Sequence, residues 1–265
     1  MKLATWNVNS LNVRLPHVLD WLRDNPIDVL CLQETKQEDS KFAYDDLKTA
    51  GYQAVHFGQK TYNGVAILST HAMTDVAHGI DGFEDEQSRV ISATINQSGN
   101  NIRVICVYIV NGQAVDSEKY EYKMRWLTAL ITWLAGELKK YPNLVLLGDY
   151  NIAPEDRDCH DPAAWVGQIL VSPKEREMFA KIVALGLYDS FRLFNTEPKN
   201  FTWWDYRMMG FRRNFGMRID HILVSDALKN QCEKCEIDKV PRKLERPSDH
   251  TPVVLTLALK TNIGI

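Results

Sequence analysis

The chain has 265 residues, of which 45% are hydrophobic and 25% are charged, a balance that is ordinary for a soluble globular protein. A chain of this length needs no disulfides for stability, and its five irregularly spaced cysteines argue against a disulfide framework and for a reducing compartment. The net charge of −3 does not indicate nucleic-acid binding, but one segment departs from it. Residues 199–218 have a local charge of +4, from Lys199, Arg207, Arg212, Arg213 and Arg218 against Asp205.

The amino-terminal residues lack the basic start and apolar stretch of a signal peptide. No apolar run approaches the ~20 residues that cross a bilayer. We therefore expect a cytoplasmic protein with no membrane partner.

Short apolar runs alternate with amphipathic stretches along the chain. Strands are predicted over residues 3–6, 27–32, 65–68, 90–95, 102–107, 144–147, 218–224 and 251–259. Helical spacing of apolar side chains predicts one helix around Leu15, Val18, Leu19 and Leu22 and a long one over residues 116–140. Ser172, Pro173 and Glu175 form a capping box with proline at the first helical position, which predicts a helix start.

The order of these elements mixes strands joined by helical crossovers with strands joined directly. This order predicts two mixed sheets packed face to face, with helices outside. No linker, repeat or low-complexity tract interrupts the pattern, so we expect a single domain over residues 1–265.

Cys232 and Cys235 have the spacing of half a zinc site. Neither a second cysteine pair nor a histidine pair accompanies them. We interpret this spacing as incidental.

Polar residues follow the predicted strands at positions that a packed core would not favour: Asn7, Glu34, Tyr108, Asp149, Asn151, Asp220, Asp249 and His250. Taken singly, each has the simpler interpretation of a residue that ends a strand or caps a turn. If the strand ends converge, however, they gather acids, amides, a tyrosine and a histidine in one place. Carboxylate and amide oxygens suit Mg²⁺ or Mn²⁺, and an Asp–His pair suits contact with a phosphate. The set is what phosphodiester hydrolysis requires.

Five motifs in this order carry a resemblance that spans residues 2–259. Each lies at a predicted strand or strand end: L-A-T-W-N-V-N (3–9), L-Q-E-T-K (32–36), G-D-Y-N (148–151), R-I-D (218–220) and S-D-H (248–250). The chain thereby resembles the exonuclease III/apurinic-apyrimidinic (AP) endonuclease family of the DNase I-like phosphoesterase superfamily. The resemblance implies a four-layered α/β sandwich of two mixed β-sheets flanked by helices, in agreement with the pattern above.

The resemblance also implies roles for residues at the matching positions. Glu34 is the expected main metal ligand, assisted by Asn7, and Asp249 is a supporting or second metal ligand. Asp149 is expected to position or deprotonate the attacking water, with Asn151 holding both. In the Asp220–His250 pair the histidine contacts the scissile phosphate, and Tyr108 and Asn111 face the phosphate. The implied cofactor is Mg²⁺, with Mn²⁺ as a substitute.

The aromatic and basic segment at residues 201–207 resembles the DNA-gripping loop of the family. Without the resemblance, a hydrophobic corner with a solvated charged face explains it equally well. Aromatic rings interleaved with arginines can stack on bases or sugars and pair with phosphates. The expected DNA contacts are Arg207, Arg212 and Arg213, and the expected pocket for a flipped-out baseless sugar is formed by Trp203, Met217 and Ile219.

Residues 158–168 lie where members of the family differ in length and bulk. In relatives this loop borders the lesion pocket, so Trp165 and Gln168 are candidate specificity residues. An equally good interpretation makes Trp165 a core residue that anchors the loop.

We therefore expect a metal-dependent hydrolase of double-stranded DNA that acts as a monomer, cleaves 5′ to AP sites, removes 3′-blocking groups and 3′ nucleotides, and leaves a 3′-hydroxyl. The nearest alternative is a specialised 3′-phosphodiesterase or 3′→5′ exonuclease without AP-endonuclease activity. A phosphoesterase acting on lipid or inositol phosphates is disfavoured because no apolar membrane-binding loop is present. A DNA-binding protein with an inactive site is disfavoured because every catalytic-type residue is present.

Overall fold

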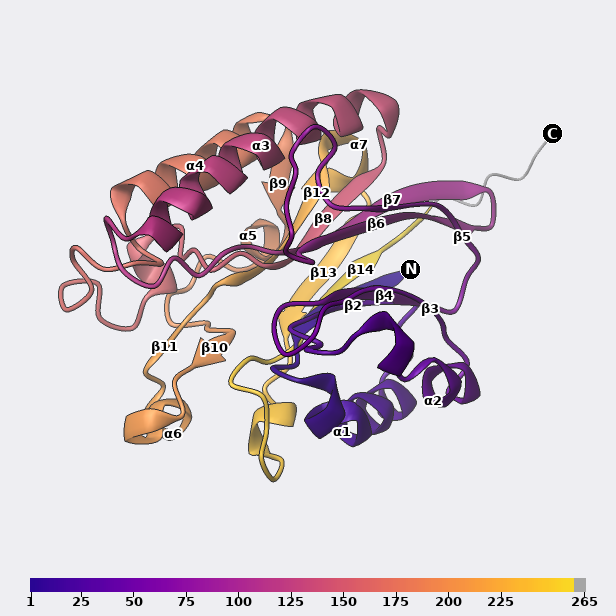
Figure 1. Ribbon diagram of the computed structural model, residues 1–265, viewed down its shortest axis with the longest axis horizontal. Coiled ribbons are helices and arrows are strands. Elements are labelled where there is room, and N and C mark those ends of the chain that lie inside the picture. Colours follow the sequence, from indigo (N-terminus) through magenta and orange to yellow (C-terminus); the bar gives the residue numbers. More distant parts are fainter. Residues whose placement is uncertain (260–265) are drawn as a thin grey trace.

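The computed structural model describes residues 1–259, and Figure 1 shows its layered arrangement. Two six-stranded mixed sheets lie face to face. Helices α1 (Leu11–Asp24) and α2 (Tyr44–Thr49) lie outside the first sheet, and α3 (Glu118–Lys140) and α4 (Pro173–Ala184) lie outside the second. The predicted four-layered sandwich is therefore confirmed.

The first sheet has the strand order β13-β14-β1-β2-β4-β3. Its central pair, β1 and β2, is parallel, and every other neighbouring pair is antiparallel. The strands are β1 (Lys2–Asn7), β2 (Val29–Gln33), β3 (Gln53–Phe57), β4 (Val65–Ser69), β13 (Cys232–Ile237) and β14 (Val253–Leu257). The parallel pair is joined through α1, as a crossover requires.

The second sheet has the order β5-β6-β7-β8-β12-β9. Its parallel pair is β7 and β8, joined through α3. The strands are β5 (Met73–His78), β6 (Val90–Gln97), β7 (Asn100–Tyr108), β8 (Leu144–Asp149), β9 (Leu187–Asp189) and β12 (Asp220–Ser225). The two sheets thus share one plan, with a parallel pair inside and antiparallel strands around it.

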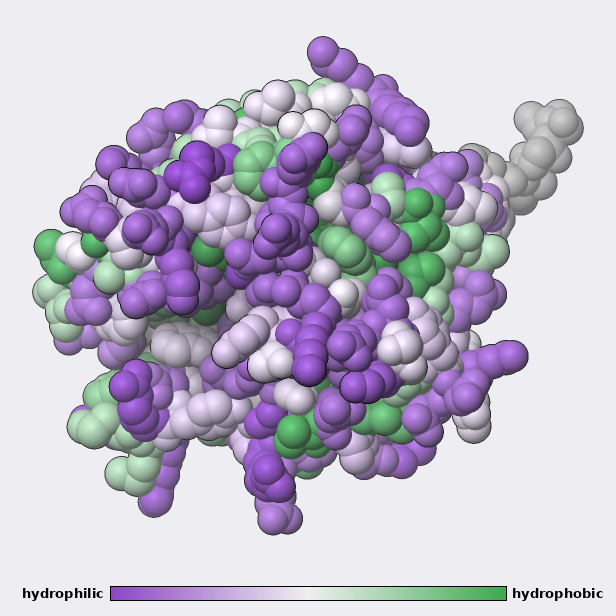
Figure 2. Space-filling model, in the orientation of Figure 1, coloured by the Kyte–Doolittle hydropathy of each residue, from purple (hydrophilic) through white to green (hydrophobic). Residues whose placement is uncertain are grey.

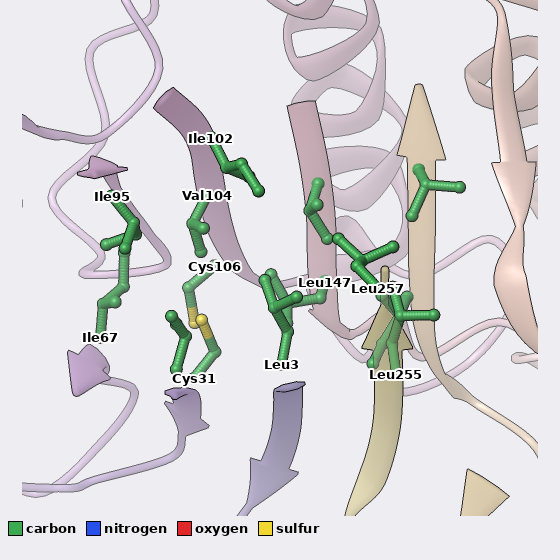
Figure 3. Packing of buried hydrophobic residues seen from close by; sticks show 14 of the residues in the cluster. Leu3, Cys31, Ile67, Ile95, Ile102, Val104, Cys106, Leu147, Leu255 and Leu257 are labelled. Carbon is green, nitrogen blue, oxygen red and sulfur yellow. The ribbon is translucent and has the colours of Figure 1, made fainter. Parts of the chain in front are cut away.

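The main core lies between the two sheets (Figure 3). Leu3 and Cys31 of the first sheet face Cys106 and Leu147 of the second, and all four are fully buried. The sulfur atoms of Cys31 and Cys106 point toward each other as free thiols. Two further clusters hold the helices against the outer faces of the sheets. Burial on both faces explains why the sequences of the central strands are continuous apolar runs.

Local sequence signals fix the two long outer helices. The Ser117 side chain caps α3 by accepting a hydrogen bond from the Tyr120 amide. Ser172 and Glu175 form the predicted capping box of α4, and Pro173 is its first residue. Among residues 1–259, no helix combines the length and apolar character needed to cross a membrane.

A small arm, residues 203–217, projects from the end of the sandwich (Figure 1). It consists of the paired short strands β10 (Trp203–Trp204) and β11 (Gly216–Met217), with α6 (Gly210–Arg213) at its tip. Figure 2 shows green, apolar side chains gathered on this tip at the lower left of the view. Two further short helices, α5 (Ser190–Phe194) and α7 (Asp226–Lys229), flank β12.

Candidate active site

The predicted convergence of strand ends is confirmed at one end of the sandwich. In the first sheet the parallel pairing of β1 with β2 places Asn7 beside Gln33, immediately before Glu34. In the second sheet β8 ends at Asp149, opposite Asp220 at the start of antiparallel β12. Each sheet therefore supplies half of the polar cluster.

Unusual backbone geometry accompanies this cluster. Glu34 and Asn151 both adopt the left-handed conformation, with φ of 52° and 49°. Gly148 has φ of +154°, and a Cβ atom there would lie 1.9 Å from the Val107 carbonyl oxygen. The chain therefore needs glycine immediately before Asp149, because β7 approaches too closely for a side chain. Non-glycine residues held at positive φ concentrate at functional sites.

Asn7 joins the two halves of the site. Its Nδ2 donates to Glu34 Oε1 at 2.9 Å and to Asp149 Oδ2 at 2.8 Å. Its Oδ1 accepts from the Asn9 amide at 3.0 Å. The side chain thus presents nitrogen to both carboxylates. In this geometry Asn7 fixes the spacing of the two acids, and its role beside a metal stays a prediction.

Asp149 lies at the centre of the cluster and is almost fully buried. Its Oδ1 accepts from the Asn151 amide at 2.9 Å, and its Oδ2 lies 3.3 Å from Asn151 Nδ2. Burial raises the pKa of Asp149 to about 7, although the nearby His250 cation opposes the rise. A carboxyl group with this pKa can exchange protons with water near neutral pH.

His250 is held by Asp220 from the second sheet. Its Nδ1 lies 2.9 Å from Asp220 Oδ2, and its Nε2 lies 3.7 Å from Asp149 Oδ2. Burial lowers the pKa of His250, but the charges of Asp220 and Asp149 outweigh it and raise the pKa to about 10. This direction favours the protonated imidazole, which suits contact with a phosphate oxygen.

The side chains present fit a divalent metal ion. Ligand atoms of Glu34, Asp149 and His250 lie within 4.8 Å of one another, and they form the one such group found in residues 1–259. A carboxylate pair suits a hard cation. Because His250 is protonated through Asp220, we assign the metal to Glu34 and the adjacent Asp149 oxygen and leave the imidazolium to the phosphate.

Asp249 is not in this group, and its expected role as a supporting or second metal ligand stays a prediction. Its Oδ1 accepts from Asn9 Nδ2 and its Oδ2 accepts from Trp203 Nε1, both at 3.0 Å. Both oxygens are therefore occupied. In this geometry Asp249 orients Trp203.

A cleft of about 380 Å³ opens over the cluster. Its lining includes most of the predicted site residues: Glu34, Tyr108, Asn111, Asp149, Asn151, Trp165, Trp203, Ile219, Asp249 and His250. Asn111 Nδ2 donates to Asn151 Oδ1 at 3.0 Å, which ties a predicted phosphate contact to a predicted catalytic residue. Burial, followed by the negative charge of Glu34, raises the pKa of Tyr108, so its hydroxyl stays protonated and can donate to a phosphate.

One predicted residue of the sugar pocket, Met217, and one predicted specificity residue, Gln168, do not line the cleft. Met217 is fully buried beneath Trp203 and Ile219, so it supports the pocket wall and does not form the surface of the cleft. Gln168 is exposed in the loop, where its side chain donates to the Ala164 carbonyl at 3.0 Å, and it does not line the cleft. Trp165 does line the cleft, and it is also packed against the cluster that contains Met217.

Fewer arginines of the basic segment at residues 199–218 are free to contact DNA than the local charge suggested. Arg218 is fully buried between Asp158 and Asp189, with Nε 2.7 Å from Asp158 Oδ1 and NH1 2.8 Å from Asp189 Oδ2. Arg218 therefore contributes to the local charge of +4 but is not exposed to a polyanion. Arg207 is exposed but paired with Asp205 at 2.5 Å. Arg212 and Arg213 at the tip of the arm are exposed.

The sequence analysis did not single out Lys36 and Asn9. Lys36 Nζ lies 2.9 Å from Glu34 Oε2 and 2.6 Å from Asn9 Oδ1. Both residues belong to quoted motifs, and a lysine two residues after a candidate metal ligand was the available signal. The interpretation of the Cys232–Cys235 spacing as incidental agrees with the structure, in which Cys235 packs against Ser190.

Comparison with known proteins agrees with this geometry. Residues 4–250 match the model of the Endonuclease/Exonuclease/phosphatase family. The chain is 35% identical to Exodeoxyribonuclease III of Haemophilus influenzae over 263 residues, which cover 96% of this chain and 98% of that protein.

Two solved structures are also similar. A 3′ phosphatase, NExo, from Neisseria bound to product DNA hairpin is 48% identical, with a TM-score of 0.95 and coverage of 98% of this chain and 100% of that one. An AP endonuclease from Archaeoglobus fulgidus is 39% identical, with a TM-score of 0.93 and the same coverage. The chain therefore belongs to the endonuclease/exonuclease/phosphatase family, in its exonuclease III/AP endonuclease branch, and is a DNA-repair nuclease that hydrolyses phosphodiesters.

Proposed function

We propose that this protein uses Mg²⁺ to hydrolyse DNA phosphodiesters at damaged or blocked 3′ ends and 5′ to AP sites, leaving a 3′-hydroxyl. The observation that carries the proposal is the convergence of Glu34, Asp149 and the His250 cation within one cleft. Glu34 and Asp149 would hold the metal. When bound, the metal neutralises negative charge on the phosphate and lowers the pKa of bound water.

The side chains of the site carry out the other catalytic roles, which are proton transfer and contact with the phosphate. Asp149 takes the proton from the attacking water, and Asn151 and Asn7 hold the carboxylate in place. His250 donates to a non-bridging phosphate oxygen, and Asp220 keeps the imidazole oriented and charged. Tyr108 donates a further hydrogen bond to the phosphate. The water oxygen bonds to phosphorus as the bond from phosphorus to the 3′ oxygen breaks, and the departing 3′ oxygen takes a proton from solvent and becomes the hydroxyl.

DNA is proposed to lie across the cleft against the arm. Arg207, Arg212 and Arg213 face its phosphates, and the ring of Trp203 faces the sugar. Trp203 is well held for this role by its bond to Asp249. We further propose that the protein acts as a monomer in the cytoplasm.

Processing of 3′ ends is favoured over AP-site cleavage by the position of Trp165. Trp165 forms part of the lining of the cleft, as Trp203 does. An internal AP site must press a continuous, bent duplex against the pocket, whereas a 3′ end needs only to reach the metal. A relative described as a 3′ phosphatase at 48% identity supports this preference, and one described as an AP endonuclease at 39% keeps the second activity open.

The test is a side-by-side assay of a duplex with an internal AP site and a duplex with a 3′-phosphate, in Mg²⁺ and in chelator. We expect both reactions to stop in chelator and the 3′-phosphate to be removed faster in Mg²⁺. Glu34→Ala should abolish activity at low Mg²⁺ and recover partly at high Mg²⁺ or with Mn²⁺, with its melting temperature preserved. Full activity of Glu34→Ala in chelator would contradict the proposed metal dependence.

A further inference from the structure

A second hollow opens directly off the catalytic cleft. It measures about 300 Å³ and lies between the loop at residues 158–168 and the arm. Trp165, Trp203, Asp205 and Arg207 line both spaces, so a molecule seated in the cleft can extend into this hollow without leaving the protein surface. The volume lies at the lower end of the range of roughly 300–1,000 Å³ for ligand pockets.

The far wall of the hollow is aromatic and preassembled. The rings of His160 and Phe215 stack with centroids 5.1 Å apart and an interplanar angle of 18°. Trp165 meets His160 edge to face at 6.4 Å. The Arg213 guanidinium lies 4.1 Å from the centre of the Phe215 ring. These contacts fix the rings before any ligand arrives, which lowers the entropic cost of stacking a flat molecule against them.

The charge in the hollow favours a neutral occupant. The Asp205 carboxylate is paired with Arg207, so these two lining residues form an ion pair, and the Arg213 guanidinium lies over the Phe215 ring. His160 uses Nδ1 toward the Gly216 carbonyl at 3.2 Å, which leaves Nε2 for a ligand. Flat aromatic walls with a few polar groups at the edge suit a molecule with an aromatic face and a hydrogen-bonding rim. In a nuclease bound to DNA, the molecule with this chemistry is a nucleobase.

We propose that this hollow binds the unstacked base of the 3′-terminal nucleotide. This inference rests on the proposed function and deepens it. With the scissile phosphate at Asp149 and His250 and the sugar between Trp165 and Trp203, the base extends toward His160 and Phe215. A terminal base pair is the cheapest in a duplex to open, because only one side of it is stacked. The hollow thereby lets the enzyme remove complete nucleotides as well as baseless blocking groups.

Kinetics test the proposal through a ratio measured on one enzyme preparation. Two duplexes are compared, one ending in an ordinary 3′ nucleotide and one in the same sugar without a base. Phe215→Ala should lower the ratio of kcat/KM for the first to kcat/KM for the second by about 10-fold, the effect of one lost stacking partner. Phe194→Ala, which removes a comparably half-exposed ring outside the hollow, should leave the ratio unchanged. An unchanged ratio in Phe215→Ala would overturn the proposal, and because a poorly folded variant loses both reactions together, the ratio is independent of folding.

A photochemical experiment locates the base without relying on activity. A duplex with 5-iodouracil at the 3′ terminus is bound to the wild-type enzyme in chelator, irradiated and digested, and the cross-linked peptides are sequenced. We expect cross-links to residues 160–165 or 203–215. Cross-links confined to other segments, or obtained from these segments only when the iodouracil lies in the opposite strand, would overturn the proposal. Failure of the enzyme to bind any 3′-ended duplex would instead contradict the proposed function.

Discussion

Asp149 is subject to opposing influences that no single neighbour explains. Burial disfavours its charge, whereas the His250 cation and the Asn7 amide favour it. The balance brings the pKa of the carboxyl to about 7, which makes it both a proton acceptor and a group that a metal ion can stabilise in its charged form. Burial lowers the pKa of the adjacent His250, but the charges of Asp220 and Asp149 raise it to about 10, so near neutral pH the carboxyl is the group of the pair that exchanges a proton and the imidazole is the one that retains it.

The variant Asp149→Asn tests whether Asp149 is the proton acceptor, because it keeps the shape of the side chain and removes the negative charge. We expect turnover to fall by at least ~10²-fold, the usual contribution of a general base. DNA binding should hold or tighten, since a carboxylate facing a phosphate repels it. Single-turnover rates and a separate binding titration measure the two quantities. A change confined to KM would remove Asp149 from the chemistry.

The identity of the catalytic residues was predictable from the sequence, whereas their exposure and orientation were not. Glu34 and Asp220 end or begin apolar strands, and a polar residue there must face the end of the sheet. Met217 and Arg218 also flank a strand, but whether they face solvent depends on what the arm and Asp158 place over them. The orientation of the Asn7 amide likewise depends on two acids brought from distant parts of the chain.

The loop at residues 158–168 is anchored by buried contacts at its start and is exposed to solvent in its later part. Asp158 at its start is fully buried and bonded to both Arg192 and Arg218. Beyond it Val166 is exposed. Trp165 lies between the buried start and the exposed part of the loop. It lines the cleft and also packs against the buried cluster, so its position fits both predicted roles, that of a specificity residue and that of an anchor for the loop.

Trp165→Ala should therefore change the two reactions unequally. Opening the cleft should raise AP-site cleavage relative to 3′-phosphate removal, because only the first requires a bent duplex to fit beside the loop. Some loss of melting temperature is expected from the lost packing. Both rates and the melting temperature are measured on one preparation, with Gln168→Ala as the matched control outside the cleft. Equal loss of both reactions would assign Trp165 to anchoring alone.

The arm supports a different prediction, which concerns ionic strength. If Arg207, Arg212 and Arg213 contact phosphates, the slope of log affinity against log salt should become shallower by about 0.9 for each contact removed. The triple alanine variant is compared with wild type by binding titrations at several salt concentrations. Arg23→Ala, a surface arginine on α1 paired with Asp20, is the control. An identical slope in the triple variant would assign these arginines to a solvated face.

Sequence patterns predicted the buried elements well and the edge strands poorly. The central strands β2, β4 and β8 are buried at every residue, which gives uninterrupted apolar runs. Strands β5 and β13 lie at sheet edges, are largely exposed and contain register shifts, so their sequences show neither a run nor an alternation. β3 was missed for the same reason, because it too is an edge strand with little burial.

For the whole molecule, stability depends on a buried charge network that includes His221. Burial, followed by the charge of Arg218, lowers the pKa of His221 to about 4, below its ordinary value of 6.5. The folded protein therefore resists protonation at His221 in a range where the unfolded chain accepts a proton. The contribution of this residue is complete above pH 6.5 and is lost as the pH falls toward 4.

Measurements on His221→Asn at several pH values isolate the contribution of His221 to the free energy of unfolding. The free energy of unfolding of wild type should exceed that of the variant most at pH 7 and above, and the difference should shrink by up to ~3 kcal/mol by pH 4. Chemical denaturation at each pH supplies the measurement. A difference that stays constant across the range would show that His221 titrates alike in both states.

The two halves of the catalytic cluster also have a consequence for how the protein is made. Trp6 donates to the carbonyl of His250 across 244 positions of the chain, and Asn7 bridges to Asp149 across 142. A ribosome releases these residues in order, at roughly 5–20 residues per second. A nascent chain that has emerged as far as Asp220 holds its carboxylates but no imidazole to meet a phosphate. We therefore expect a nascent chain of that length to lack nuclease activity, because the catalytic cluster is complete only when His250 joins it.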